Sequence, residues 1–434
     1  MPGPSYADAV AYLFGLQRHG IKLGLESMGR LLQALGSPHE HLRTLHIGGT
    51  NGKGSTAAMV ASILRAAGLR VGLYTSPHLV DFRERIRVNG LMIKEEDVAD
   101  LTARLRRACP PDVPATFFEF TTAMALEYFN HTGVDVAVLE VGMGGRFDAT
   151  NVVMPVVSCI TTVAMDHEQY LGADLRAIAF EKAGIVKPGV PVVLGRLEAE
   201  ARTVVMEAAR GRGALLRELG VDFAVEGSLP SDCTYHRRGR SIRNLACPLR
   251  GRHQLDNLAC AIAVIEEVVR CGLSVEESAI RQGLAEVQWP GRLEVMAERP
   301  LVLVDGAHNP AAAAAVAEYL ASFRAQCPSS KVWLVLGMMQ DKDHAGFVHA
   351  MMPHVDEVIL TVPRVSRAAS GETLSQWFPS DGPPARVIPA VSDAMFEARK
   401  RASPEDLICV TGSFMLIGEV KAILHGMSMS PLRG

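Results

Sequence analysis

RTLHIGGTNGKGST, at residues 43–56, is the most informative segment of the sequence. Its pattern predicts a buried strand over residues 43–48, a glycine-rich turn over 48–54 and a helix over 55–67. The backbone amides of such a turn, together with the N-terminus of the helix behind it, create a site for an anion. The segment therefore predicts a phosphate-binding loop in a fold of alternating strands and helices.

The side chains of this loop indicate which anion it binds. Lys53 adds a full positive charge for the β- and γ-phosphates of a nucleotide, and Ser55 or Thr56 can reach a magnesium ion. The strict spacing G-x-x-x-x-G-K-[ST] is not met, because Ile47 stands at its first position and Gly54 separates the lysine from the serine. We interpret the segment as a variant of the nucleotide-binding P-loop.

Two considerations narrow the ligand of the loop. A glycine-rich turn with an incidental lysine is the simpler interpretation, but the strand context, the lysine position and the following hydroxyls all agree with phosphate binding. A GTPase also needs an N-K-x-D motif that reads guanine, and the nearest match, QDKD at 340–343, lacks that pattern. We therefore expect ATP rather than GTP.

The rest of the chain repeats the alternation of strand and helix that is typical of parallel sheets. Further strands are predicted at 71–77, 134–142, 155–167, 301–306, 331–337, 356–362 and 406–412, and helices at 253–271, 274–286 and 311–323. The turn-like QWPGR at 288–292 indicates a domain boundary. We expect an α/β protein with an N-terminal, P-loop ATPase-type, doubly wound domain over 1–290 and a smaller, Rossmann-like α/β domain over 291–434.

One segment departs from this alternation. Residues 220–250 carry few helical signals and include the basic stretch HRRGRSIR at 236–243. We expect a β-rich excursion or surface hairpin there, with its basic side chains forming a solvated face.

Composition limits the classes of protein to which the chain can belong. The 434 residues are 48% hydrophobic and 21% charged, which is typical of a globular protein rather than a disordered one. With 44 basic and 47 acidic residues the net charge is -3, so the overall charge favours neither nucleic acid nor an anionic membrane. The eight cysteines form no C-x-x-C pair, and no apolar run long enough for a leader or a span occurs. We expect buried free thiols in a monomeric cytoplasmic protein.

Eight motifs follow one another in a specific order. They are GGTNGKGST (48–56), TSPHLVDFRERIRVNG (75–90), LEVGMGGRFDATN (139–151), MDHEQYLG (165–172), FEKAGIVKPG (180–189), PGRLE (290–294), DGAHNP (305–310) and GMMQDKD (337–343). With this set the chain resembles the folylpolyglutamate synthase/dihydrofolate synthase family, which is related to the Mur peptidoglycan ligases. The resemblance extends from about residue 20 to about residue 420.

The resemblance implies an activity and its ligands. Members of the family use ATP to attach L-glutamate to dihydropteroate or to the γ-carboxylate of folates. The carboxylate is first converted to an acyl phosphate, which the glutamate amine then attacks. The cofactor implied is Mg²⁺ at two sites, and the partners are these small molecules. Such catalysis depends mainly on positioning and on balancing charge.

The resemblance also assigns metal ligands and catalytic residues. Ser76 and Glu140 match ligands of one magnesium, and His167 matches a ligand of the second. Lys182 matches a lysine that the family carries as a carbamate, and Lys53 completes the catalytic set. From the residues alone, Lys182 is more simply a surface helix lysine, and Glu140 is equally well a solvent-facing residue at a strand edge.

Two segments are assigned to the pterin substrate by the same resemblance. They comprise Thr116, Phe117, Phe118 and Glu119, and then Phe147, Asp148 and Ala149. Phenylalanine rings suit a flat heterocycle, and the aspartate can accept hydrogen bonds from its N–H groups. Core packing at a helix start explains the two neighbouring phenylalanines equally well.

ATP contacts are expected from both domains. They comprise Asn51, Gly52, Lys53, Gly54, Ser55 and Thr56 of the P-loop and, through the resemblance, Asn257, Arg292, Asp305 and His308. We expect the nucleotide to lie between the two lobes. The segment 305–309 also reads as a strand-to-helix turn, with Asn309 as the helix cap and Pro310 at the first helical position.

The sequence disfavours two other functions. A Mur-type ligase acting on a peptidoglycan precursor is disfavoured, because the P-loop begins at residue 48 and leaves no room for an N-terminal domain that binds a UDP-sugar. A P-loop switch or regulatory ATPase is disfavoured by the second α/β domain with its DGAHN motif and by the missing guanine motif.

Overall fold

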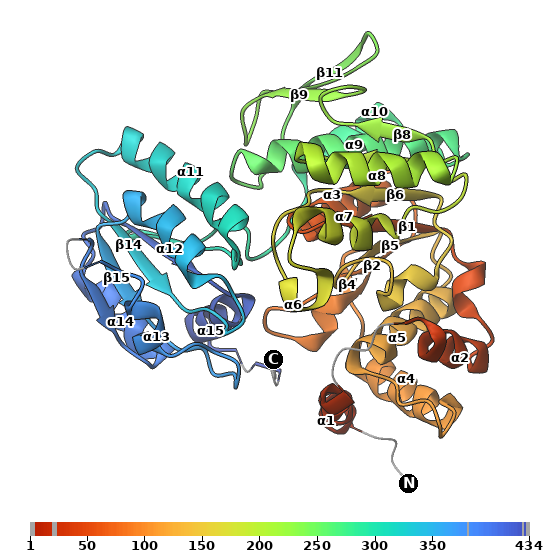
Figure 1. Ribbon diagram of the computed structural model, residues 1–434, viewed down its shortest axis with the longest axis horizontal. Coiled ribbons are helices and arrows are strands. Elements are labelled where there is room, and N and C mark those ends of the chain that lie inside the picture. Colours follow the sequence, from red (N-terminus) through yellow and green to blue (C-terminus); the bar gives the residue numbers. More distant parts are fainter. Residues whose placement is uncertain (1–4, 20–23, 380–381, 428, 431–434) are drawn as a thin grey trace. The chain divides into compact units, whose positions relative to one another are not determined.

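The computed structural model describes residues 5–19, 24–379, 382–427 and 429–430. The chain folds into two compact units. The first unit comprises Met1–His78, Phe82–Pro248 and Gln254–Gln288, and the second comprises Leu79–Asp81, Leu249–His253 and Trp289–Gly434. Each unit has its own sheet (Figure 1).

The main sheet of the first unit has the strand order β4-β3-β2-β5-β1-β6-β7-β8. Its strands are β1 Thr44–Gly48, β2 Val71–Tyr74, β3 Ile86–Val88, β4 Leu91–Met92, β5 Val136–Glu140, β6 Val157–Ile160, β7 Val192–Leu194 and β8 Leu216–Glu218. Strands from β2 to β8 in this order run parallel, while β3 and β4 are antiparallel. The jumps in strand order place helices on both faces, as expected for a doubly wound sheet.

Helices cover both faces of this sheet, with α3 and α10 on one side and α4 and α5 on the other (Figure 1). The α-helices are α1 Tyr6–Gly15, α2 Glu26–Ala34, α3 Lys53–Ala66, α4 Glu95–Ala108, α5 Phe117–Thr132, α6 Glu168–Leu171, α7 Leu175–Ala183, α8 Ala199–Gly211, α9 His253–Arg270 and α10 Glu277–Ala285. Short 3₁₀ helices are η1 Leu16–His19, η2 Pro38–His41, η3 Phe82–Arg85 and η4 Ala149–Val152. Because β1 and β5 are buried along their whole length, they form the centre of the unit.

The second unit is a smaller sheet with the order β12-β13-β17-β14-β15-β16, in which only the β12–β13 pairing is antiparallel. The strands are β12 Glu294–Glu298, β13 Leu301–Val304, β14 Val332–Leu336, β15 Glu357–Leu360, β16 Ala385–Val387 and β17 Leu407–Thr411. The helices are α11 Pro310–Gln326, α12 His344–Met351, η5 Met352–His354, α13 Gly371–Ser375, α14 Val391–Arg401 and α15 Phe414–His425. These two sheets confirm the predicted fold class.

The start of α11 shows how the sequence sets an element boundary. Asn309 accepts a hydrogen bond from the backbone N–H of Ala312 at 2.9 Å, and Pro310 occupies the first helical position, where its missing N–H costs nothing. The cap and the proline were both predicted, and both are confirmed.

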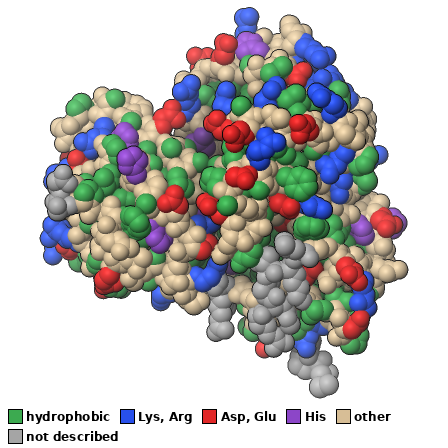
Figure 2. Space-filling model, viewed as in Figure 1, with side chains coloured by type: hydrophobic (Ala, Val, Ile, Leu, Met, Phe, Trp, Pro, Cys, Tyr) green, Lys and Arg blue, Asp and Glu red, His purple; other side chains and the backbone are tan. Residues whose placement is uncertain are grey.

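Residues 220–250 form a small antiparallel sheet that joins α9 through buried charges. Its order is β11-β10-β9, with β9 Ala224–Gly227, β10 Cys233–Arg237 and β11 Arg240–Leu245. Lys and Arg side chains, with acidic ones among them, are visible at the top of the molecule, where Figure 1 places β9 and β11 (Figure 2). The predicted β-rich excursion is therefore confirmed.

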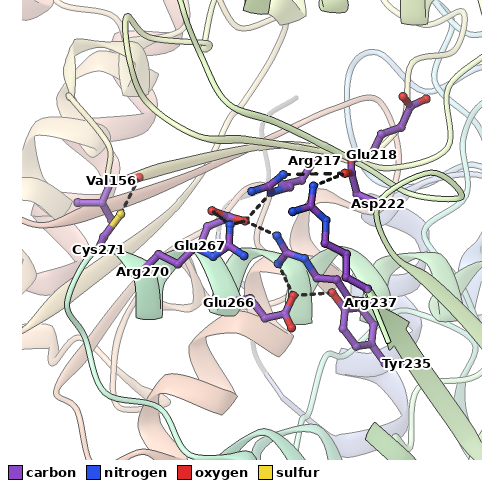
Figure 3. Close-up of polar contacts among 11 residues, drawn as sticks. Val156, Arg217, Glu218, Asp222, Tyr235, Arg237, Glu266, Glu267, Arg270 and Cys271 are labelled. Carbon is purple, nitrogen blue, oxygen red and sulfur yellow. Dashed lines mark hydrogen bonds and ion pairs between the residues drawn. The ribbon is translucent and has the colours of Figure 1, made fainter. Parts of the chain in front are cut away.

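The prediction of a solvated basic face is wrong for one residue of this sheet. Arg238, Arg240 and Arg243 are exposed, but Arg237 is buried. Its guanidinium donates to Glu266 and, at 2.7 Å, to Glu267 of α9 (Figure 3). The sequence pattern of β10 could not indicate this, because the acidic partners lie about 30 residues later on a helix.

Glu267 is the centre of this network. It accepts hydrogen bonds from Arg237 and from Arg217 of β8, the latter at 2.9 Å, while Tyr235 donates to the neighbouring Glu266 at 2.8 Å (Figure 3). Burial alone would raise the pKa of Glu267, but the hydrogen bonds from the two arginines outweigh it and leave that pKa lowered. The network therefore connects the main sheet, the small sheet and α9.

All eight cysteines are free; five are buried, whereas Cys109 and Cys327 are partly exposed and Cys271 is exposed, so the expectation of burial fails for these three. Within the described ranges, no helix has the length and the apolar character that crossing a bilayer requires.

Replacing Glu267 by Gln is expected to lower the free energy of unfolding by about 3–5 kcal/mol, because two buried guanidinium groups lose the carboxylate that balances them. Urea-induced unfolding measures this loss. It should be fully present above pH 4.5, the ordinary pKa of a glutamate, and should shrink as the pH falls through the lowered pKa of Glu267.

The matched control is Glu277→Gln, which removes an exposed i,i+4 pair with Arg281. This change should cost less than about 0.5 kcal/mol. A loss below about 1 kcal/mol for Glu267→Gln would contradict the view that the buried network holds the small sheet.

Candidate active site

The carboxyl ends of four neighbouring parallel strands bring the predicted site residues of the first unit together. In the sheet register, Ile47 of β1 lies beside Glu140 of β5, and Gly48 lies beside Ile160 of β6. Ser76 follows β2, which pairs with β5. The P-loop, the serine, the glutamate and the segment after β6 therefore share one edge of the sheet, where ligands bind in open α/β folds.

The P-loop is held by the segment after β6. The hydroxyl oxygen of Thr162 accepts a hydrogen bond from the backbone N–H of Asn51 at 2.9 Å. The backbone carbonyl of Thr162 accepts a second one from the backbone N–H of Thr50 at 2.7 Å. Thr161 donates its hydroxyl hydrogen to the carbonyl of Asn51 at 2.6 Å. These contacts connect positions about 110 residues apart and fix the conformation of the loop.

Two glycines of the loop are required by its geometry. Gly49 has a φ of +138°, and a Cβ there would lie 2.1 Å from the hydroxyl oxygen of Thr161. Gly52 has a φ of +86°, and a Cβ there would lie 2.3 Å from the amide oxygen of Asn257. Only glycine combines this backbone with such a close approach.

Helix α9 contacts the loop from the other side. Asn257, one of the predicted ATP contacts, is buried and donates to Gln254 at 2.9 Å. Gln254 lies 3.4 Å from the hydroxyl of Ser55 at the start of α3. Gly54, Ser55 and Thr56 are buried in the first turn of that helix, while Asn51, Gly52 and Lys53 are half-buried.

Two lysine amines lie on carbonyl groups of the P-loop. Lys53 donates to the carbonyl of Thr50, and Lys182 of α7 donates to that of Gly49, each at 3.0 Å. Lys182 is buried, so the interpretation as a surface lysine is wrong. Burial, and then the nearby charge of Lys53, lower the pKa of Lys182 to about 7, so a sizeable share of its amine is neutral near neutral pH.

Ser76 and Glu140 are adjacent. The backbone N–H of the serine donates to a carboxylate oxygen of Glu140 at 3.0 Å, and the glutamate is buried rather than solvent-facing. A hydroxyl and a carboxylate are the hard oxygen donors that Mg²⁺ prefers. No group of three or more His, Cys, Asp or Glu residues arranged for a metal occurs in the part of the chain that the structure describes. Two protein ligands, with water and phosphate oxygens for the remainder, suit magnesium rather than a metal enclosed by protein.

His167 lies in the segment that follows β6. Its backbone has a φ of +53°, uncommon for a residue with a Cβ, and it caps the short helix α6. Its Nε2 lies 3.9 Å from a carboxylate oxygen of Asp166, which also interacts electrostatically with Lys182. The predicted ligand and the predicted carbamate lysine are thus both near this aspartate.

The segment 116–119 begins α5. Thr116 and Glu119 form a capping box. The threonine hydroxyl accepts a hydrogen bond from the backbone N–H of Glu119 at 3.2 Å, and the glutamate carboxylate accepts one from the backbone N–H of Thr116 at 2.8 Å. Phe117 is buried and stacks on Phe14 with ring centroids 5.2 Å apart. Phe118 is half-buried and packs against Gly142, where a Cβ would lie 2.4 Å from its ring.

The glycine-rich loop after β5 is organised by Asp148. Its carboxylate accepts from both the backbone N–H and the hydroxyl of Thr150 and from the backbone N–H groups of Met143 and Gly142. Burial raises its pKa, although these hydrogen bonds oppose the shift. The single hydroxyl hydrogen of Thr150 is donated to Asp148. The hydroxyl oxygen therefore accepts the hydrogen bond that joins it to Nε2 of His46 at 2.7 Å. Asp148 therefore has a structural role, and its contact with a pterin stays a prediction.

Phe147 and Ala149 flank this aspartate. Ala149 is buried in η4. Phe147 is half-buried, and the guanidinium of Arg146 lies 4.6 Å from its ring centroid and 5.3 Å from that of Phe180. The aromatic surface available at this loop is thus partly covered by a cation.

In the second unit, two of the remaining predicted residues, Arg292 and His308, lie near the ring of Phe414. The guanidinium of Arg292 lies 4.6 Å from the centroid of Phe414, and the ring of His308 lies 5.6 Å from it. Asp305 accepts from the backbone N–H groups of Leu293 and Ala307, each at 2.8 Å. The strand-to-helix turn at 305–309 is thus confirmed, and it positions the histidine and the arginine together.

Sequence reasoning missed several of these residues. Thr161, Thr162 and Gln254 hold the P-loop, and Phe414 packs against Arg292 and His308. A signal existed for the threonines, since two adjacent hydroxyls follow a buried strand at the edge that carries the P-loop. No signal marked the glutamine or the phenylalanine, whose partners are distant in sequence.

Known proteins match the chain along most of its length. Residues 47–265 match the Mur ligase middle domain, and residues 291–414 match the Mur ligase, glutamate ligase domain. A probable bifunctional folylpolyglutamate synthase/dihydropteroate synthase of Haloferax volcanii is 39% identical over 96% of this chain. The chain spans only 50% of that relative's length.

Two solved structures match over nearly the whole of both chains. Escherichia coli FolC in complex with DHPP and ADP is 34% identical, with a TM-score of 0.89 over 98% of this chain and 99% of that one. The bifunctional folylpolyglutamate synthase/dihydrofolate synthase of Yersinia pestis, complexed with AMPPNP and a Mn ion, is 35% identical. Its TM-score is 0.88, and the match covers 98% of this chain and 100% of that one.

Proposed function

Because this chain belongs to the folylpolyglutamate synthase/dihydrofolate synthase family of Mur ligases, we propose that it is an ATP-dependent, ADP-forming ligase that adds L-glutamate to dihydropteroate and to the γ-carboxylate of folates. The observation that carries the proposal is one sheet edge that combines a P-loop held by hydrogen bonds, the amines of half-buried Lys53 and buried Lys182, and the adjacent Ser76 and Glu140. We place the reaction in the cytoplasm and in a single chain.

The proposed reaction has two steps. A carboxylate oxygen of the acid attacks the γ-phosphorus of ATP, which forms an acyl phosphate and releases ADP. The amine of glutamate then attacks the acyl carbon, loses a proton, and phosphate leaves from the tetrahedral intermediate. Both steps move negative charge between oxygens, so the protein contributes mainly by positioning the reactants and by stabilising charge.

The residues of the first unit suit these tasks. The amides of the P-loop and the Lys53 ammonium would hold the phosphates, and the hydrogen bonds from Thr161 and Thr162 keep those amides in place. Half-buried Phe118 offers an aromatic face for the acid substrate. For the second unit, nucleotide contacts from Arg292, Asp305 and His308 remain part of the proposal.

The metal is part of the same proposal. A divalent ion, as in the Yersinia pestis protein with AMPPNP, would offset phosphate charge. Ser76 and Glu140 would hold one Mg²⁺, and His167 a second. Lys182 would assist the second as a carbamate, formed when its neutral amine attacks CO₂ and releases a proton. Its lowered pKa and its burial beside the P-loop support this modification.

ADP release tests the activity directly. Purified protein with Mg-ATP should release ADP only when an acid, dihydropteroate or tetrahydrofolate, and L-glutamate are both present, because the acyl phosphate turns over only when the amine attacks it. A coupled ADP assay with each component omitted in turn measures this dependence. Release that is indifferent to acid and glutamate would exclude a folate ligase and favour a regulatory ATPase.

Lys53→Ala is expected to reduce turnover by at least about 100-fold, because the phosphates lose a charged contact that strengthens as charge moves in the transition state. The comparison variant is Lys94→Ala, an exposed residue before α4 that should keep full activity. Circular dichroism verifies that both variants fold. Retained activity of a folded Lys53→Ala protein would remove the phosphate-loop assignment.

Lys182→Ala should abolish turnover and regain part of it when short carboxylic acids such as acetate are added, because the acid replaces the carbamate's negative charge. A second readout does not depend on turnover. In ¹³C-bicarbonate the wild-type protein should show a carbamate carbon signal that Lys182→Ala lacks and Lys187→Ala retains. An unchanged rate in the alanine variant, or identical spectra, would remove the carbamate from the proposal.

A further inference from the structure

Arg85, at the end of η3, is a buried cation to which the proposed reaction gives no role. The residue is only 8% exposed. Its Nε donates a hydrogen bond of 2.8 Å to Nδ1 of His78, which is equally enclosed. The side chains of both residues were thus removed from water during folding, although one of them carries a full charge.

Aromatic rings surround this pair. The guanidinium of Arg85 lies 5.2 Å from the centroid of Phe117, which stacks on Phe14. The ring of His78 meets Phe14 and Phe82 edge-on, with centroids 6.1 and 6.2 Å away. The result is an aromatic enclosure around one positive charge, which attracts the cation but does not neutralise it.

No carboxylate neutralises the charge. Among the residues that the structure describes, no Asp or Glu oxygen lies within 4.0 Å of the guanidinium, and its Nη groups have no hydrogen-bond acceptor. Burial lowers the pKa of Arg85, and the electrostatic attraction of Tyr74, Glu84 and Glu140 opposes that shift without reversing it. A buried cation without a counter-ion is costly, so its presence suggests that an anion arrives during the working cycle.

The histidine supplies a second unused donor. Because Nδ1 of His78 accepts from Arg85, the hydrogen of the neutral imidazole is on Nε2. That Nε2 is buried and has no hydrogen-bond partner within the described residues. This Nε2 therefore lacks the acceptor that a buried donor normally finds, and it lies on the residue that binds the guanidinium of Arg85.

The enclosure adjoins the candidate active site. The carbonyl of Arg85 accepts from the backbone N–H of Thr75 at 3.0 Å, and the next residue, Ser76, donates to Glu140. Phe117, which contacts the guanidinium, is one of the residues predicted to face the acid substrate. The P-loop already supplies amides for phosphates, so the anion that suits an aromatic enclosure is an aryl carboxylate.

We infer that the Nη groups of Arg85 bind the carboxylate of the acid substrate before it is phosphorylated, and that His78 is a positioning residue that fixes the guanidinium through Nε. The inference rests on the proposed function, since it names the contact that recognises the acid. Guanidinium and carboxylate match in shape and charge, and such pairs gain strength when water is excluded.

A comparison of an acid with its uncharged amide tests this contact. Pteroate and its carboxamide are titrated calorimetrically into the full-length protein with Mg²⁺ and a non-hydrolysable ATP analogue. Arg85→Met, which keeps the apolar volume, should bind pteroate about 10- to 100-fold more weakly and should bind the carboxamide within about twofold of wild type. Affinity for the ATP analogue should stay unchanged in the same experiment.

Controls separate recognition from folding. Arg83→Met, on the same 3₁₀ helix but paired with Glu95, should retain the preference for the acid. If the methionine variant does not fold, Arg85→Gln, which is also neutral but can still hydrogen-bond to His78, makes the same prediction. Equal weakening of acid and amide, unchanged pteroate binding, or a loss confined to the ATP analogue would each overturn the inference. Failure of the ADP assay, by contrast, would contradict the proposed function itself.

Discussion

Hydrogen bonds between the P-loop and the segment after β6 are the interaction on which the first unit's site depends. Backbone amides bind an anion only if they are held in a converging arrangement, and a loop rich in glycine does not hold itself. Thr161 and Thr162 supply the missing restraint from the adjacent parallel strand, and Gln254 and Asn257 supply it from α9. The parallel register that aligns β1 with β5 and β6 then determines which other side chains reach the same edge.

The sequence predicts much of the fold because the informative signals are local. The strand before the P-loop, the helix after it, and Asn309 with Pro310 at the start of α11 depend on residues within a few positions of one another. Local signals do not predict the burial of Arg237. Its burial depends on Glu266 and Glu267, which lie on another element, and no local pattern distinguishes it from the exposed Arg238 beside it.

The candidate site shows the same division. The order of the motifs predicts that Ser76, Glu140 and Lys182 lie near the P-loop. The residues alone instead predict an exposed Lys182, because a lysine on a helix is usually exposed, whereas this one is buried. A second limit of prediction concerns four polar residues of the candidate site, which are Thr116, Glu119, Asp148 and Asp305. Each accepts hydrogen bonds from nearby backbone N–H groups, so these polar residues hold their own segments in shape. Residue type and motif order do not distinguish a side chain that holds a loop from one that also contacts a ligand.

The buried cations at the site have a consequence for the lifetime of the protein. Lys182 and Arg85 are basic side chains that the fold encloses, so without a bound anion the protein bears a desolvation cost that such an anion would reduce. Whatever binds the folded state and not the unfolded one shifts the folding equilibrium by mass action. A shortage of such an anion would therefore increase the fraction of chains that is open to proteolysis, and the abundance of the protein would follow the supply of what it binds.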